Sequence, residues 1–358
     1  MFASNANFPT RDFRCINTML TESQLIESLK PEYWLALNPG LSITDDLLSR
    51  SPGTPYPVEN IDADRHMCQF HDDGYFSAPD IFSREEATKL ANGIVNTTLA
   101  GFPATFCLIY DEYWQPLRRL DHLLEPIMGK GYKLLPDFWF YHIRNDDTGS
   151  GWSPHRDLQF PNPFNRDGNP NVLNLWIPLT DATPLNGCMY ILPRSRDPEY
   201  PNDYASLLGV DLTGFNPIRI DQLQNFQALP ATAGSVLGWG QFVFHWGARS
   251  SKWAPQPRIN YSMYVQRGDV GNYDDLAINL NGENNFELSF KMRLGIIARS
   301  LWQYQNSKNL SLDPLLLEFS KYCHKFLNGR GYQKLNISYS DPCWCGSGRI
   351  YKNCCGNA

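Results

Sequence analysis

The stretch RINYSMYVQ, residues 258–266, alternates between two kinds of side chain, the period-2 pattern of a β-strand with different faces. Four more short apolar or alternating runs precede it, separated by Gly, Pro, Asn and Asp. They are KLLPDFWFYHIR (133–144), NVLNLWIPLT (171–180), CMYILP (188–193) and SVLGWGQFVFHW (235–246). Short strands at this spacing predict an antiparallel sandwich or barrel over residues 132–267. The stretch Ser195–Pro230 is expected to interrupt it as a long insertion.

Helical patterns flank this β region. Thr21–Leu37 has helical spacing that Pro31 is expected to split. A strand is expected near Tyr75–Phe76. A helix is expected from about Arg84 to Thr97, with Ser83 as its N-cap. Beyond Gly271, two further helices are predicted by FELSFKMRLGIIARSLWQYQ (286–305) and DPLLLEFSKYCHKFL (313–327).

The composition limits the classes of protein to consider. The 358 residues are 42% hydrophobic and 19% charged, which excludes a largely disordered chain. The net charge is −6 and no Lys/Arg-rich run occurs, so nucleic acid and anionic membranes are not expected partners. No secretory signal or membrane-spanning stretch is apparent, and a cytoplasmic location is expected.

A candidate metal site begins at WSPHRD, residues 152–157. On a strand, positions i and i+2 share a face, so His155 and Asp157 can converge on one ion. His245 offers a second imidazole at the end of an apolar run. Two His and one carboxylate form the facial triad of non-haem Fe(II) oxygenases. Since H-x-D alone is a weak motif, a hydrogen-bonded surface pair and a buried structural histidine remain the alternative interpretation.

Arg258 favours the oxygenase interpretation. 2-Oxoglutarate chelates iron through its 2-oxo acid end, and its distal carboxylate needs a planar, permanently charged partner. Arg258 opens the strand after His245 and shares a face with Asn260, Ser262 and Tyr264. That polar face could line a pocket; alternatively, it faces solvent and Arg258 forms a surface ion pair.

Several of these segments together resemble the phytanoyl-CoA dioxygenase family of Fe(II)/2-oxoglutarate oxygenases, from about His71 to Gln266. The similar segments, in family order, are HDDGYFSAPDIFSREEATKL (71–90), WSPHRD (152–157), NLWIPLTDATPLNGCMYILPRSR (174–196) and GSVLGWGQFVFHWGARS (234–250). Two departures stand out. Pro193-Arg194-Ser195-Arg196 replaces the family's P-G-S-H, and Gly247 stands where a serine commonly follows the distal histidine.

The resemblance implies a mainly β double-stranded β-helix (jelly roll) with flanking helices. It also implies iron held by His155, Asp157 and His245, with Arg258 on the distal carboxylate of 2-oxoglutarate. Trp176 would flank this cosubstrate, and Asn174, on the same strand face, is a further candidate. The expected organisation is an N-terminal extension (1–67), a jelly-roll oxygenase domain (68–270), C-terminal helices (271–338) and a zinc knuckle (339–358).

The C-terminal segment DPCWCGSGRIYKNCCG, residues 341–356, resembles the SEC-C motif. Its four thiols, Cys343, Cys345, Cys354 and Cys355, can close a tetrahedral zinc site, and metal binding offsets the ordering entropy of so short a piece. All four positions on the metal are then filled by protein, so the zinc is expected to be structural. The motif's usual role implies a docking module for a protein partner.

The expected function is therefore an Fe(II)- and 2-oxoglutarate-dependent oxygenase that hydroxylates a small or medium organic metabolite. Two alternatives remain. One is a catalytically silent jelly-roll scaffold with a docking tail, which has no need for the triad together with Arg258. The other is a zinc-dependent hydrolase on the same three ligands, which leaves Arg258 without a role.

Overall fold

The computed structural model describes residues 20–51, 62–145, 154–157, 160, 163–165, 168–200, 220–282, 284, 286–306 and 313–327. Its strands are β1 (Tyr75–Ala78), β2 (Lys133–Ile143), β3 (Val172–Pro178), β4 (Met189–Leu192), β5 (Gln227–Leu229), β6 (Val236–Gly240), β7 (Phe244–Gly247) and β8 (Arg258–Gln266). Its helices are α1 (Glu22–Glu27), α2 (Pro31–Leu37), α3 (Ala63–Asp73), α4 (Arg84–Leu99), α5 (Asp121–Met128), α6 (Phe290–Asn306) and α7 (Pro314–His324). Short 3-10 turns occupy η2 (Ala104–Ile109), η3 (Asp111–Tyr113), η4 (Pro116–Arg119), η5 (Arg194–Arg196), η8 (Ile220–Asn225) and η9 (Lys325–Leu327).

The strands form two antiparallel sheets. The larger sheet has the order β1-β6-β3-β8-β2 and the smaller one β5-β4-β7, and among the described residues they do not close into a barrel. An apolar cluster includes Trp176 and Leu237 of the larger sheet and Met189 and Ile191 of the smaller. The two sheets therefore pack face to face, which confirms the expected β region as a pair of antiparallel sheets.

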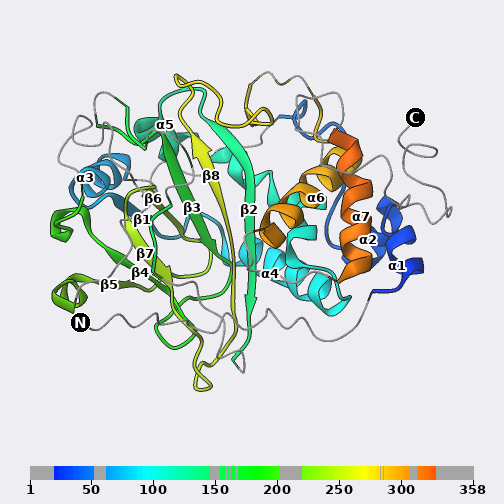
Figure 1. Cartoon of the computed structure of the whole chain (residues 1–358), viewed down its shortest axis with the longest axis horizontal. Coiled ribbons are helices and arrows are strands. Elements are labelled where there is room, and N and C mark those ends of the chain that lie inside the picture. The colour runs from blue at the N-terminus through cyan, green and yellow to red at the C-terminus, as the bar shows by residue number, and fades with distance from the viewer. Residues whose placement is uncertain are drawn as a thin grey trace.

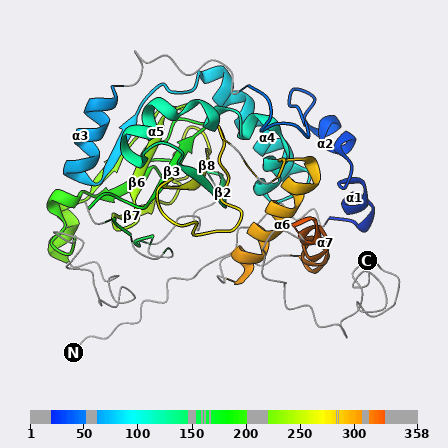
Figure 2. The same cartoon turned by 90° about the horizontal axis from the view of Figure 1, so that it is seen from above.

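Helices cover the other face of the larger sheet. Along β8, Ile259, Tyr261, Met263 and Val265 point into the main apolar core, which extends from Leu20 to Leu327 and so includes both flanking helical regions. Figure 1 shows α1, α2, α6 and α7 gathered at the β2 side of the sheets, and Figure 2 shows α3 at the far end from them. Within the part of the chain that the structure describes, each helix is too short or too polar to span a membrane.

The helix boundaries follow the local sequence signals. Pro31 begins α2 and separates it from α1, as predicted, because a proline is tolerated in the first turn of a helix but not in its interior. Ser83 caps α4 through the backbone N–H of Glu86, whose side chain accepts from the N–H of Ser83 in return. Both predictions are confirmed.

Two segments differ from the prediction, and a third has an irregularity that the sequence did not address. The run 235–246 is two strands in different sheets, because the chain turns between them with the N–H of Val243 on the carbonyl of Gly240. The stretch Ser195–Pro230 is not wholly an insertion, since it ends in β5 of the smaller sheet. In β2 the register shifts between Leu135 and Phe138, where Pro136 has no N–H to donate to the ladder.

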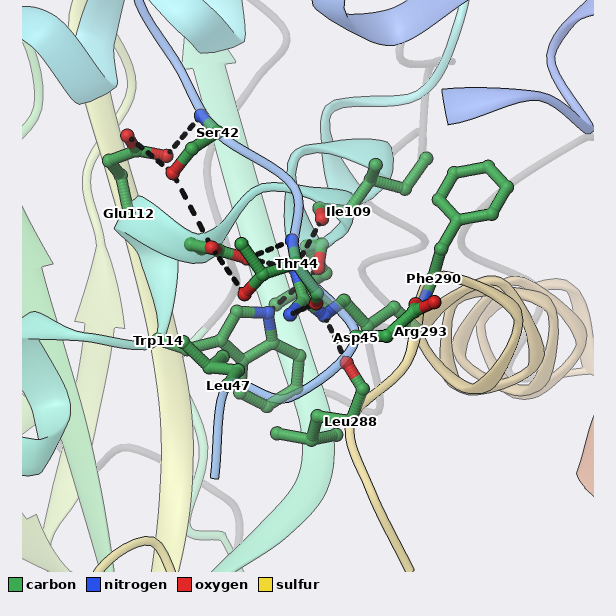
Figure 3. A network of polar contacts seen from close by, with 12 residues as sticks. Ser42, Thr44, Asp45, Leu47, Ile109, Glu112, Trp114, Leu288, Phe290 and Arg293 are labelled. Carbon is green, nitrogen blue, oxygen red and sulfur yellow. Dashed lines mark hydrogen bonds and ion pairs between the residues drawn. The ribbon is translucent and has the colours of Figure 1, made fainter. Parts of the chain in front are cut away.

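A buried polar network joins the N-terminal segment to α6 (Figure 3). The Arg293 guanidinium, fully buried, lies 2.6 Å from Asp111 and donates to the carbonyl of Thr44 at 2.7 Å. Asp111 in turn accepts from the Thr44 hydroxyl at 2.8 Å. The backbone of residues 42–45 is thereby fixed between η3 and α6.

Candidate metal and cosubstrate site

His155, Asp157 and His245 converge between the two sheets. Their nearest ligand atoms all lie within 4.8 Å of one another. The carboxylate oxygens of Asp157 lie 3.3 Å from Nε2 of His155 and 3.5 Å from Nε2 of His245. These separations suit three atoms that share one cation, because each metal–ligand bond is about 2.0–2.2 Å long. The structure therefore brings the three residues within reach of one cation, and their role as metal ligands stays a prediction.

Backbone pairing produces this arrangement. His155 and His245 form an isolated antiparallel bridge, with both N–H groups donating at 3.0 Å to the opposite carbonyl. The segment 154–157 thus continues the smaller sheet beyond β7. The N–H of Asp157 donates to the carbonyl of Gln241 at 2.9 Å, which holds the carboxylate beside both imidazoles.

Neighbouring polar groups orient the ligands. Nδ1 of His245 lies 3.0 Å from the carbonyl of Val243, so a proton on Nδ1 leaves the Nε2 lone pair facing Asp157. The amide of Asn174 donates to Asp157 at 2.9 Å. Asn174, predicted as a cosubstrate contact, is therefore hydrogen-bonded to the candidate metal ligand Asp157 in this structure.

The charge states suit metal binding. Burial lowers the pKa of His245 to about 4, which keeps its imidazole neutral at physiological pH. Burial disfavours the charged form of Asp157, but the two imidazoles and the Asn174 amide outweigh it and hold the pKa of the carboxyl well below its usual range. A neutral imidazole and an ionised carboxylate are the forms that coordinate a cation.

Arg258 lies inside the fold and is not part of a surface ion pair. Arg258 is 3% exposed. Its guanidinium donates to the carbonyl of Gly187, and the guanidinium carbon lies 5.9 Å from the centre of the Tyr141 ring. Its Nε is buried without a partner. Although burial lowers the pKa of Arg258 to about 10, the group stays charged at neutral pH. A buried cation with an unused donor fits a carboxylate ligand.

Gly247 makes room for this guanidinium. A Cβ at Gly247 would lie 3.1 Å from Nη1 of Arg258, closer than ordinary packing allows. The arginine therefore packs directly against the backbone that follows His245. A glycine in place of the family's serine leaves the space for this contact.

The other predicted residues fall into two groups. Trp176 is 3% exposed and packs between the sheets, on the same strand face as Asn174. The cysteines Cys343, Cys345, Cys354 and Cys355 lie outside the described residues.

Three polar residues facing this interior were not predicted as site residues, although the sequence placed one of them, Asn260, on the polar face that could line a pocket. Asn260 is fully buried, and neither polar atom of its amide has a hydrogen-bond partner. It lies opposite Tyr141 across β2 and β8. Trp239, whose Nε1 is also unpartnered, lies 4.8 Å from the His245 ring. Buried donors and acceptors are seldom left unpaired without a ligand or water to satisfy them. The polar face of RINYSMYVQ was the available signal for Asn260, whereas Tyr141 is found only from the strand register.

The two sheets and the His-Asp-His set between them define a candidate mononuclear metal site of the facial-triad class. Residues 80–254 match the family model described as phytanoyl-CoA dioxygenase (PhyH), and residues 340–357 match the SEC-C motif. Both resemblances drawn from the sequence are thus confirmed, and the chain carries a PhyH region and a SEC-C motif. The PhyH match includes all three candidate ligands and ends four residues before Arg258.

Three solved structures illustrate what this chain is similar to. The chain is 18% identical to the "non-heme alpha ketoglutarate dependent epimerase SnoN from nogalamycin biosynthesis", with a TM-score of 0.42 and coverage of 63% of this chain and 94% of the other. It is 15% identical to the "non-heme monooxygenase, ThoJ-Ni complex" (TM-score 0.48, coverage 68% and 98%). It is 16% identical to "EctD from S. alaskensis with 2-oxoglutarate and 5-hydroxyectoine" (TM-score 0.41, coverage 63% and 82%). No curated protein matched the sequence.

Proposed function

We propose that this chain is an Fe(II)- and 2-oxoglutarate-dependent oxygenase that hydroxylates a small or medium organic metabolite with release of succinate and CO₂. The observation that carries the proposal is the convergence of one carboxylate and two imidazoles inside the fold. The buried Arg258, with a free donor, is the second element that such a reaction requires. The PhyH match supports the same reaction class.

The proposed roles follow from the chemistry of each side chain. His155, Asp157 and His245 would hold Fe(II), which supplies the oxidative chemistry when O₂ and 2-oxoglutarate are present. Arg258 would bind the distal carboxylate of 2-oxoglutarate. Trp176, on the same interior face of the larger sheet, would flank the cosubstrate.

Asn174 and Asn260 complete the proposed site. Asn174 would keep Asp157 oriented through its hydrogen bond, and its unpartnered Oδ1 could accept from a ligand. Asn260 would contact the cosubstrate, because it follows Arg258 by two residues on the same face of β8 and both polar atoms of its amide are unpartnered.

The architecture fits the proposal. We infer that the two facing sheets, with segment 154–157 at the β7 edge, form the jelly roll of residues 68–270, flanked by an extension at 1–67 and helices at 271–338. Residues 339–358 would form a structural zinc knuckle that docks a protein partner, a role supported by the SEC-C match.

The proposal is tested by succinate release from 2-oxoglutarate across a panel of candidate metabolites, with Fe(II) and ascorbate present. Substrate-dependent succinate supports the oxygenase. Its absence across the panel, together with failure of the anaerobically purified protein to bind Fe(II) and 2-oxoglutarate, would point to a silent scaffold. Zinc in the triad site, with hydrolysis in place of succinate release, would favour a hydrolase.

Replacing Arg258 with methionine is expected to raise the KM for 2-oxoglutarate by at least about 30-fold, because losing one partner of a buried charge pair costs about 2–5 kcal/mol. Steady-state succinate release over a range of 2-oxoglutarate concentrations measures this effect. The exposed Arg249, nine residues earlier in the chain, provides the matched control as Arg249→Met. An unchanged KM in the Arg258 variant would remove the arginine from the cosubstrate site.

Replacing Cys343 and Cys354 with serine is expected to lower the zinc content by about one ion per chain, because two of four thiolate ligands are lost. Succinate release should be unaffected, since the proposed iron ligands lie elsewhere in the chain. Elemental analysis checks the first expectation and the succinate assay the second. Unchanged zinc in the double variant would rule out the knuckle.

A further inference from the structure

The side chain of Arg156 lies between the two metal ligands of WSPHRD but points away from them. Neighbouring residues on an extended segment face opposite sides, so Arg156 projects behind the site while His155 and Asp157 face its interior. There its guanidinium forms an ion pair with Asp197, at 2.7 Å from Nη1 and 3.3 Å from Nη2. The two side chains are 1% and 0% exposed. Arg156 and Asp197 thus form a buried, bidentate ion pair behind the His155, Asp157 and His245 side chains.

The same guanidinium also contacts the turn before β7 and the first residue of β7, the strand that carries the third ligand. Nη1 of Arg156 donates at 2.6 Å to the carbonyl of Phe242, three residues before His245. The rings of Phe242 and Phe244 lie 4.7 Å and 5.2 Å from the guanidinium carbon. Arg156 therefore contacts both chain segments that supply ligands.

Asp197 in turn anchors the arginine to the turn after β4. Its Oδ1 accepts from the N–H of Glu199 at 3.0 Å, and Glu199 gives Arg156 a second, partly exposed carboxylate at 3.4 Å. Arg156 is thus held from three directions. These contacts at the end of the side chain restrict where the backbone between His155 and Asp157 can lie.

Burial of this pair is not explained by stability alone. Desolvating two charges costs several kcal/mol per ion, and well-packed apolar side chains are often as stabilising at such positions. A charged pair with fixed geometry does, however, hold a backbone segment in one place. Groups that orient metal ligands change metal affinity by about 10–100-fold when they are removed.

We propose that Arg156 is a positioning residue: paired with Asp197, it holds His155, Asp157 and the His245 strand in the arrangement that binds one metal ion. This inference rests on the proposed function, because it concerns the same metal site. It adds a determinant of metal affinity that touches neither metal nor substrate.

The test is an anaerobic titration of the whole chain with Fe(II) as the probe, with one equivalent of zinc bound at its tail and no zinc free in solution to compete for the triad. Arg156→Gln is expected to raise the Kd for Fe(II) by about 10–100-fold. Arg156→Lys should fall between this variant and the original protein, because lysine keeps the charge but cannot donate in a planar fork.

Arg293→Gln provides the matched control. Arg293 belongs to an equally buried ion pair, with 0% exposure on both sides, on the helical side of the larger sheet. The control should lose stability and keep its affinity for Fe(II). If Arg156→Gln does not fold, the double variant Arg156→Met/Asp197→Leu, which removes both charges, replaces it and should bind Fe(II) equally weakly.

The outcomes separate the two ideas. If the unsubstituted protein binds Fe(II) and folded Arg156 variants bind it equally well, the positioning role is overturned while the proposed function stands. If the unsubstituted protein does not bind Fe(II), the proposed function itself fails. A weaker Fe(II) affinity in both the Arg156 and the Arg293 variants would also overturn the inference, because it would reflect general loss of structure.

Discussion

The Asp157→Ala variant is expected to lose succinate formation by more than about 100-fold, because loss of a direct ligand should exceed the 10–100-fold effects of residues that only orient ligands. Among the residues that the structure describes, Asp157 is the carboxylate that faces both His155 and His245, at 3.3 Å and 3.5 Å. Without it, the two imidazoles are the candidate ligands left to hold the cation. The variant should therefore fail both in Fe(II) binding and in 2-oxoglutarate turnover.

Asp269→Ala is the control for this experiment. Asp269 is an exposed aspartate whose ion pair with Arg267 lies just after β8. It should retain normal turnover. If Asp157→Ala kept the turnover of the unsubstituted protein, the metal site would have to be abandoned, since no arrangement of the remaining two ligands forms the same triad.

Arg293→Met is expected to lower the free energy of unfolding by about 3–5 kcal/mol, because it leaves the buried carboxylate of Asp111 without its countercharge. The guanidinium also donates to the carbonyls of Ile109 and Leu288, each at 2.7 Å. Both carbonyls, labelled Ile109 and Leu288 in Figure 3, lose this donor in the variant. Urea unfolding of both proteins measures the difference.

The double variant Arg293→Met/Asp111→Leu should recover much of that loss, because it removes the uncompensated charge. Lys30→Met, in the exposed pair with Glu27, should leave the urea midpoint unchanged. A single Arg293 variant as stable as the unsubstituted protein would mean that this network does not hold the N-terminal segment against α6.

Much of the local structure could be predicted from the sequence. Period-2 alternation identified β8, and the Ser83 and Glu86 pair identified the start of α4, because both signals act within a few residues. The three candidate ligands were also found. H-x-D needs only strand spacing, and His245 follows an apolar run.

The pairing of strands could not be predicted in the same way. Run 235–246 reads as one apolar stretch, yet it crosses from the larger to the smaller sheet at Gly240–Val243. Gly240 and Gln241 mark that turn only weakly, because Gly238 interrupts the same run without ending its strand. Tyr141 meets Asn260 only through the register of two strands more than a hundred residues apart. The hydrogen bond from Asn174 to Asp157 depends on the same long-range packing.

The placement of the triad between two layers has a mechanical consequence. His155 and His245 extend from the smaller sheet, while Asp157 is tied by Asn174 to the larger one. A cation shared by all three would cross-link the layers, so the folded chain would gain stability by mass action as free metal rises above its dissociation constant. Removing the metal with a chelator would then weaken the packing between the two sheets as well as empty the proposed metal site.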